Sequence, residues 1–212
     1  MTCLVSPMRR DFITVVSGLP RSGTSLMMQM LAAGGISPLT DALRRADESN
    51  PRGYLEFEPV KRLRGDKTWL DSARGHAVKV IHLLLPELPH DGRFEYRVLL
   101  MKRAMDEVIA SQAVMLARLG KTSADAGTLA KIYASQLSQA EQWLASHSCF
   151  AVQPVEHHRV LAEPRLVAVE INAFLGSDLD AAAMERAVDV SLYRQRGRTA
   201  VGSDDGAPRK ID

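Results

Sequence analysis

The sequence predicts an α/β fold: three layers, with a mainly parallel sheet and helices on both faces. Four short apolar, β-branched stretches alternate with helical patterns, an order typical of a parallel sheet covered by helices. The third stretch is apolar almost throughout, as strands buried on both faces are. The 212 residues suit one domain over residues 1–212, and the composition of residues 197–212 predicts a mobile tail.

The composition excludes several classes of protein. A net charge of +2 does not predict a nucleic-acid-binding surface, although it allows a local basic pocket. Cys3 and Cys149 form neither a disulfide framework nor a metal-binding spacing. No apolar run approaches the roughly 20 residues of a membrane span, and residues 1–10 lack the apolar core of a signal peptide. We therefore expect a cytoplasmic protein without a membrane span.

The first predicted strand, residues 12–16, leads into a loop that has glycine at both ends. Gly18 and Gly23 let the backbone curl without Cβ clashes, so successive N–H groups can converge on one anion. A helix is expected over residues 26–33, with the positive end of its dipole aimed at the same point. This order predicts a phosphate-binding loop, with an ordinary Gly/Ser turn as the alternative.

The loop has the Gly-x-x-x-x-Gly spacing of the Walker P-loop, but Thr24 replaces the lysine that reaches the β/γ-phosphates. The positive charge lies within the loop, at Arg21. The segment resembles the Pro-Lys-Ser-Gly-Thr-Thr loop of sulfotransferases that use 3′-phosphoadenosine-5′-phosphosulfate (PAPS). Arg21 departs from that lysine, but its planar fork suits oxyanions. The resemblance implies a P-loop nucleotide-kinase-like fold in which the 5′ end of PAPS is bound by Pro20, Arg21, Ser22, Gly23, Thr24 and Ser25.

A second segment supplies candidate carboxylates. Residues 50–56 resemble the Asn-Pro-x-Gly-Tyr-x-Glu segment of bacterial sulfotransferase-like proteins, which lies beside the phosphosulfate loop. By that resemblance Glu56 is the first candidate for the general base, and Glu58 is a weaker one. The alternative is that Glu56 is an acidic residue in the first turn of a helix, where the dipole favours it. That helix is expected to bear apolar residues at helical intervals: Val60, Leu63, Trp69 and Leu70.

The second predicted strand, residues 77–81, is apolar except for Lys79. A lysine within such a run is unusual and is predicted to point toward the phosphate-binding loop, where it would neutralise charge on the leaving group. Larger cytosolic sulfotransferases have Lys-Thr-His here, with the histidine as base. His82 follows Lys79 by three residues, so strand alternation puts the two on opposite faces. His82 is therefore a reserve base, with a structural role as the alternative, and residues 83–93 are expected to form a loop.

The third predicted strand, residues 96–101, precedes a second phosphate-binding pattern. In PAPS-dependent sulfotransferases Arg-Asn-Pro-x-Asp-x-x-x-Ser follows the third strand, and its arginine and serine bind the 3′-phosphate. Arg103 and Ser111 keep this separation, and Asp106 takes the aspartate place, while the Asn-Pro pair is replaced. The alternative is a charged helix start with a solvated serine. The loop at residues 18–25 and this pattern occur in the same order and positions as in the family, which favours phosphate binding at the carboxyl end of the third strand.

The remaining chain completes the alternation. An amphipathic helix is expected over residues 124–147, a fourth strand over 149–155, a helix from Pro164 to Gly176 and a short helix over 181–188. The adjacent histidines 157 and 158 lack further ligands at a zinc-binding spacing. The late Gly-x-x-Gly-x-x-Lys loop of well-known sulfotransferases is missing. Its substitute would be a basic cluster in which Arg194 binds phosphate and Tyr193 packs on adenine; a solvated basic tail is the alternative.

The resemblance implies transfer of a sulfuryl group from PAPS to a hydroxyl or amine of a small-molecule or glycan acceptor, leaving adenosine 3′,5′-bisphosphate. No metal and no nucleic-acid partner are expected. The residues assigned to catalysis are Arg21, Glu56, Lys79 and His82. One rival is a P-loop nucleotide kinase or NTPase, against which Thr24 and the absence of a clear Asp-ended strand for magnesium count. The other is a non-catalytic nucleotide-binding member, which the altered loop and missing late loop keep open.

Overall fold

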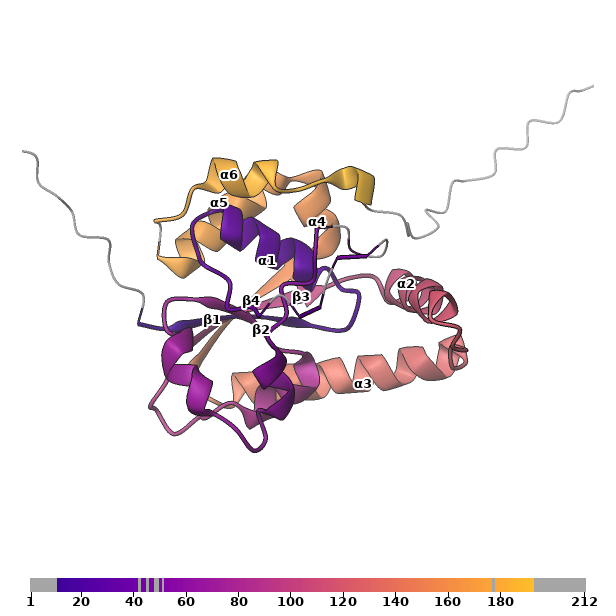
Figure 1. The fold of residues 1–212 in the computed structure, drawn as a ribbon, viewed down its shortest axis with the longest axis horizontal. Coiled ribbons are helices and arrows are strands. Elements are labelled where there is room, and N and C mark those ends of the chain that lie inside the picture. The colour runs from indigo at the N-terminus through magenta and orange to yellow at the C-terminus, as the bar shows by residue number, and fades with distance from the viewer. Residues whose placement is uncertain are drawn as a thin grey trace, which may run out of the picture.

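The centre of the molecule is a four-stranded parallel sheet with the strand order β2-β1-β3-β4 (Figure 1). The computed structural model describes residues 11–41, 43–44, 46–47, 50, 52–176 and 178–192. The strands are β1 (Ile13–Gly18), β2 (Ala77–Lys79), β3 (Tyr96–Lys102) and β4 (Phe150–Glu156). The predicted α/β fold, with a parallel sheet between helical layers, is confirmed.

The central strand β1 explains why the sequence is apolar there at nearly every position. All six of its residues are buried, and it pairs with a neighbour on each side. Ile13 and Val15 pack into the core on one face of the sheet, and Val16 packs into the core on the other. A strand covered on both faces needs apolar side chains in both directions, which removes the usual alternation.

One face of the sheet is covered by helices from both ends of the chain: α1 (Thr24–Ala33), α4 (His157–Ala162), α5 (Pro164–Leu175) and α6 (Ala181–Arg186) (Figure 1). Met27, Met28 and Met30 of α1 have no exposed surface and lie within this core. Flexible, unbranched methionines fill irregular gaps well. These three side chains therefore serve to pack α1 against the sheet.

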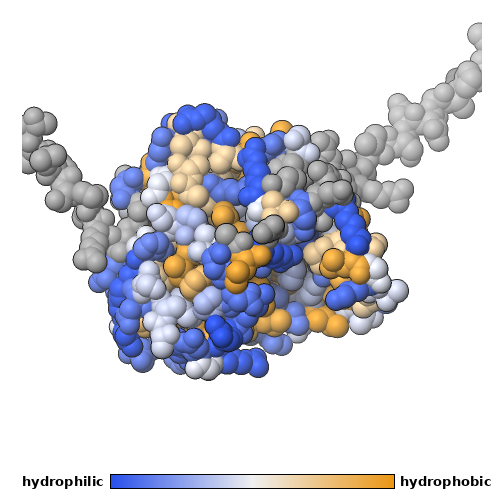
Figure 2. Space-filling model, viewed as in Figure 1, coloured by the Kyte–Doolittle hydropathy of each residue, from blue (hydrophilic) through white to orange (hydrophobic). Residues whose placement is uncertain are grey.

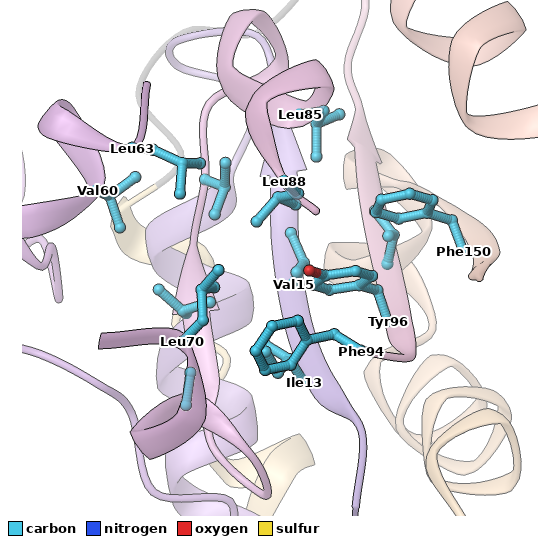
Figure 3. Packing of buried hydrophobic residues seen from close by; sticks show 14 of the residues in the cluster. Ile13, Val15, Val60, Leu63, Leu70, Leu85, Leu88, Phe94, Tyr96 and Phe150 are labelled. Carbon is cyan, nitrogen blue, oxygen red and sulfur yellow. The ribbon is translucent and has the colours of Figure 1, made fainter. Parts of the chain in front are cut away.

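The opposite face is covered by the 20-residue helix α3 (Ala126–Ala145) and three 3₁₀ helices, η1 (Glu58–Arg62), η2 (Thr68–Ala73) and η3 (His82–Glu87). Figure 3 shows this core, in which leucines of the 3₁₀ helices meet the side chains of β1, Tyr96 and Phe150. The rings of Tyr96 and Phe150 stack with their centroids 4.6 Å apart. This layer holds η1 and η3 firmly against the sheet.

Helix α2 (Met105–Arg118) connects β3 to α3 and covers neither face. In Figure 1 it lies to the right of the sheet, at about the level of the strands. The short η4 (Val190–Leu192) follows α6 and ends the described part of the chain. The placement of α2 leaves it free to form one wall of a site beside the sheet.

Three local predictions were wrong. The single helix expected after Glu56 is broken into η1 and η2, because Gly65 disfavours a helix and the Asp66 carboxylate accepts hydrogen bonds from the backbone and hydroxyl of Thr68. The second strand ends at Lys79. Part of the loop expected over residues 83–93 is the helix η3, which tolerates Pro86 because 3₁₀ turns are short.

Candidate functional site

A cavity of about 480 Å³ lies where the four strands end. A residue at or just after the end of each strand lines this cavity: Arg21 after β1, Lys79 at the end of β2, Arg103 after β3 and His157 after β4. Ligands of open parallel sheets bind outside the carboxyl ends of the strands. Seven basic side chains and two carboxylates are among the described lining residues, so the cavity favours anions: Arg21, Arg44, Arg52, Lys61, Lys79, Arg103 and Arg118 against Glu56 and Asp189.

The loop after β1 has a backbone that only glycine allows at two positions. A Cβ at Gly18 (φ 146°) would lie 2.6 Å from the Met101 carbonyl oxygen. A Cβ at Gly23 (φ 102°) would lie 2.5 Å from Cδ2 of His157. Arg21, between them, also has a left-handed backbone (φ 68°), a strain often found at functional sites.

The helix α1 begins directly after this loop, at Thr24. Its N-cap is Gly23, and no side chain caps its first turn. Amide groups of an uncapped first turn, together with the positive end of the helix dipole, favour an anion. Ser25, in the same turn, accepts a hydrogen bond from Nζ of Lys79 (2.9 Å). The loop thus has the features of a phosphate-binding site.

The two predicted phosphate motifs meet in the structure although 90 residues separate them. Nε of Arg21 donates a hydrogen bond to Oγ of Ser111 (2.9 Å). Nη1 of Arg103 donates to the backbone oxygen of Arg21 (3.0 Å). All three residues line the cavity. Two guanidinium groups and a hydroxyl are therefore held together at one place, and burial lowers the pKa of Arg21 from its ordinary value.

The acidic residue that orients Arg103 is Glu107, not Asp106. Nε of Arg103 donates to Oε2 of Glu107 (2.8 Å), and both side chains are about one-tenth exposed. Asp106 accepts from the backbone N–H of Glu107 at the exposed start of α2. Counting along the family pattern from Arg103 also places its aspartate at position 107, so the assignment of Asp106 was wrong by one residue.

Lys79 points into the cavity, as its place within an apolar strand predicted. Its ammonium group donates to Ser25 and to the backbone oxygen of Tyr54. The side chain is only 8% exposed. Burial lowers the pKa of Lys79 to about 8, while the nearby Glu56 carboxylate acts in the opposite direction. A desolvated ammonium group therefore lies beside the first turn of α1.

Glu56 and Glu58, the two candidate carboxylates, have different surroundings. Glu56 lines the cavity, and its Oε1 accepts a hydrogen bond from Arg44 (2.8 Å). Arg44 in turn lies over the ring of Tyr54, 3.5 Å from its centroid. Glu58 pairs with Lys61 on the surface and is not among the described lining residues. Of the two, only Glu56 has the position of a cavity base.

His82 lies elsewhere. It is 2% exposed, and its ring nitrogens are within hydrogen-bonding distance of the Gly18 carbonyl (3.2 Å) and the Gln136 side chain (3.0 Å). It is not among the described residues that line the cavity, whereas Lys79 is. Strand alternation does not account for this difference, because β2 ends at Lys79 and His82 begins η3. The interactions of His82 connect the loop after β1 to α3. Tyr193 and Arg194 lie outside the described residues.

Sequence reasoning missed His157, which it weighed only as a metal ligand. The ring is 6% exposed, lies against Gly23 and lines the cavity. Burial, and then the charge of Arg103, lower its pKa to about 4, so the ring is neutral at pH 7. Its position directly after the fourth strand was the available signal, since Arg103 follows the third strand in the same way. Arg52, also missed, binds Asp189 (2.9 Å) and joins the loop before Glu56 to the segment after α6.

Among the described residues, no group of three or more His, Cys, Asp and Glu side chains is arranged to hold a metal ion. Within that same part of the chain, no helix combines the length and apolar character needed to cross a bilayer.

Comparison with solved structures identifies the architecture. The sulfotransferase domain from the curacin biosynthetic pathway matches with a TM-score of 0.52 and 13% identity, over 85% of this chain and 79% of that domain. The sulfotransferase domain of the Synechococcus PCC 7002 olefin synthase matches with a TM-score of 0.50 and 15% identity, over 86% of this chain and 80% of that one. The sequence itself matches no protein-family model and no curated protein. The chain therefore has the P-loop-like α/β fold of sulfotransferase domains.

Proposed function

We propose that this protein is a sulfotransferase that transfers a sulfuryl group from PAPS to an acceptor hydroxyl or amine. The observation that carries the proposal is the contact between Arg21 and Ser111, with Arg103 donating to the backbone of Arg21. A P-loop alone would be compatible with many nucleotides. A second anion-binding group, Arg103 with Ser111, meets the loop at Arg21 within the same cavity, and this favours a nucleotide with phosphates on both its 5′ and 3′ positions.

The side chains around the cavity fit such a ligand. Arg103 and Ser111 would hold the 3′-phosphate, since a guanidinium and a hydroxyl both donate to phosphate oxygens. The turn from Pro20 to Thr24, with Ser25 and Lys79, would hold the 5′ end. The Gly18 and Gly23 positions leave no room for a Cβ, so the turn keeps the tight curvature that a phosphate needs. Arg21 connects the two groups through its side chain and its carbonyl.

PAPS supplies the sulfuryl group: a bond from the acceptor oxygen to sulfur forms as the bond from sulfur to the 5′-phosphate oxygen breaks, which leaves adenosine 3′,5′-bisphosphate. Glu56 accepts the proton that the acceptor loses. We assign this step to Oε2, because Oε1 accepts the hydrogen bond from Arg44. The ammonium group of Lys79, beside Ser25, offsets the negative charge that develops on the leaving group.

Isothermal titration separates this proposal from a nucleotide kinase. We expect the chain to bind adenosine 3′,5′-bisphosphate and to transfer the label of ³⁵S-PAPS to an acceptor in a panel of alcohols and amines. Tight binding of magnesium-ATP without binding of the bisphosphate would instead support the kinase. Binding of the bisphosphate without transfer to any acceptor would leave a nucleotide-binding protein and sink the enzymatic assignment.

The variant Ser111→Ala tests the observation that carries the proposal. It removes one hydroxyl contact worth about 1 kcal/mol, so bisphosphate affinity should fall about fivefold. Ser138→Ala, at an exposed position of α3 outside the cavity, is the matched control and should bind as the parent does. An equal effect of the two substitutions would show that Ser111 takes no part in binding.

Lys79 gives the cavity a dependence on pH. Between about pH 8 and the ordinary value of 10.5, the unfolded chain holds more of the lysine proton than the folded chain. The contribution of Lys79 to the free energy of unfolding therefore rises with pH in that window.

The affinity for the bisphosphate should change in the opposite direction and fall above about pH 8, because the free protein loses the ammonium charge of Lys79. Titrations from pH 6.5 to 9.5 measure this effect, and Lys79→Arg, which stays charged, should remove the decline above pH 8.

A further inference from the structure

We infer that the acceptor is an elongated alcohol with an apolar body, and not a sugar. This inference rests on the proposed function and concerns the part of the same cavity that lies beside the reacting groups. Three separate segments of the chain lead from a polar residue of the proposed mechanism directly to apolar lining residues.

Two of these segments begin at the proposed catalytic side chains. Glu56 is followed by Phe57 and, one turn into η1, by Val60, and all three residues line the cavity. Lys79 is followed by Val80 and Ile81, which also line it, as does Leu84 of η3. An acceptor whose hydroxyl lies at Glu56 would thus have apolar side chains next to its adjoining carbons.

Helix α2 provides the third segment. Ser111, Met115 and Arg118 are separated by four and three residues, so they share one face of the helix, and Val114 borders that face. All four line the cavity. Gln112, next to Ser111, also lines the cavity, so the lining of α2 changes from two polar side chains at the proposed phosphate site to two apolar ones about one turn later.

The apolar wall is rigid on its inner side and open on its outer side. Phe57, Val60, Val80 and Leu84 belong to, or pack against, the core between the sheet and α3. Ile81 and Val114 are lining residues that are 44% and 37% exposed. Figure 2, viewed from the same side as Figure 1, shows hydrophobic residues at the surface near the centre of the molecule and over the region of α2. The apolar lining thus reaches the surface, which suits a body longer than the enclosed space.

A saccharide needs hydrogen-bonding groups along its whole length, since its hydroxyls lose water on binding. The lining that η1, η3 and the second half of α2 provide is apolar except for three side chains: Lys61, which pairs with Glu58 at 2.7 Å, Gln112 and Arg118. Burying sugar hydroxyls against this wall would leave most of them without partners. An aliphatic or aromatic body would gain from the same contact.

The test measures binding of 1-butanol, 1-hexanol and 1-octanol, with methyl glucoside and lactose for comparison, by titration with and without saturating adenosine 3′,5′-bisphosphate. We expect affinity to rise with chain length, by up to about fourfold per methylene group that is buried, and the sugars not to bind. With labelled PAPS, KM for the alcohols should fall in the same order.

Val114→Asn should weaken 1-octanol binding at least severalfold, while Leu119→Asn should not, because Leu119 follows α2 at the surface (63% exposed) and does not line the cavity. Both positions are exposed, so both variants should fold. Bisphosphate binding together with sugar binding and no chain-length dependence would overturn the inference and leave the proposed function standing. Failure to bind the bisphosphate would count against the proposed function. The titrations of the alcohols without nucleotide would still test the inference: affinity that rises with chain length would support it, and affinity independent of chain length would overturn it.

Discussion

Replacing Arg103 by methionine is expected to weaken the binding of adenosine 3′,5′-bisphosphate by about 100-fold, because the phosphate loses a charged partner in a desolvated site, at a cost of about 3 kcal/mol. The same change removes the partner that Glu107 contacts at 2.8 Å, in a pair whose side chains are only 9% and 10% exposed. A second expected result is therefore a loss of stability of about 2–3 kcal/mol, since breaking a buried pair leaves a carboxylate that is poorly solvated. Titration measures the first effect and urea unfolding the second.

A double variant separates the two effects. Arg103→Met with Glu107→Gln removes both charges, so most of the lost stability should return while binding stays weak. Recovery of binding in the double variant would mean that Arg103 acts through the fold and not on the ligand. Binding by Arg103→Met at the affinity of the parent would make the assignment of the 3′-phosphate to this side chain wrong.

The features of the site that could be predicted from the sequence are those that depend on local geometry. A buried parallel strand must be apolar, and a loop that curls around an anion must contain glycine, so β1 and the turn from Gly18 to Gly23 were apparent. Lys79 was apparent for a related reason, because a charge within a buried strand needs a polar destination. The structure gives it two, Ser25 and the carbonyl of Tyr54.

Other features depend on packing between segments far apart in the sequence. The hydrogen bond from Arg21 to Ser111 crosses 90 residues, and no local pattern shows that Arg21 turns toward α2 rather than toward Lys79. The contact of His157 with Gly23 joins segments far apart in the sequence, and only the position of His157 directly after β4 pointed to the site. The break between η1 and η2 was missed because Asp66 competes with the helix through its own side chain, which apolar spacing does not reveal.

The substitution Glu56→Gln is expected to lower kcat by a factor of about 10²–10⁴, the usual contribution of a general base, while bisphosphate affinity stays close to that of the parent. The amide keeps the shape of the side chain but cannot take the acceptor's proton. The lost ion pair with Arg44 involves side chains that are 26% and 45% exposed, so stability should change by less than about 1 kcal/mol. Single-turnover transfer from ³⁵S-PAPS, with titration in parallel, measures the split between chemistry and binding.

Glu58→Gln is the matched control, because it makes the same chemical change two residues along the chain, in a carboxylate that is 47% exposed and paired with Lys61 on the surface. We expect it to keep the parent rate.

Parent-like turnover in Glu56→Gln would place the base elsewhere. Lys79 would then be the group to test, since burial lowers its pKa to about 8 and a neutral fraction grows just above physiological pH. A kcat that rises through pH 8 in Glu56→Gln would support that assignment, whereas under the proposed mechanism kcat should stay low at every pH, because Lys79 acts there through its charge.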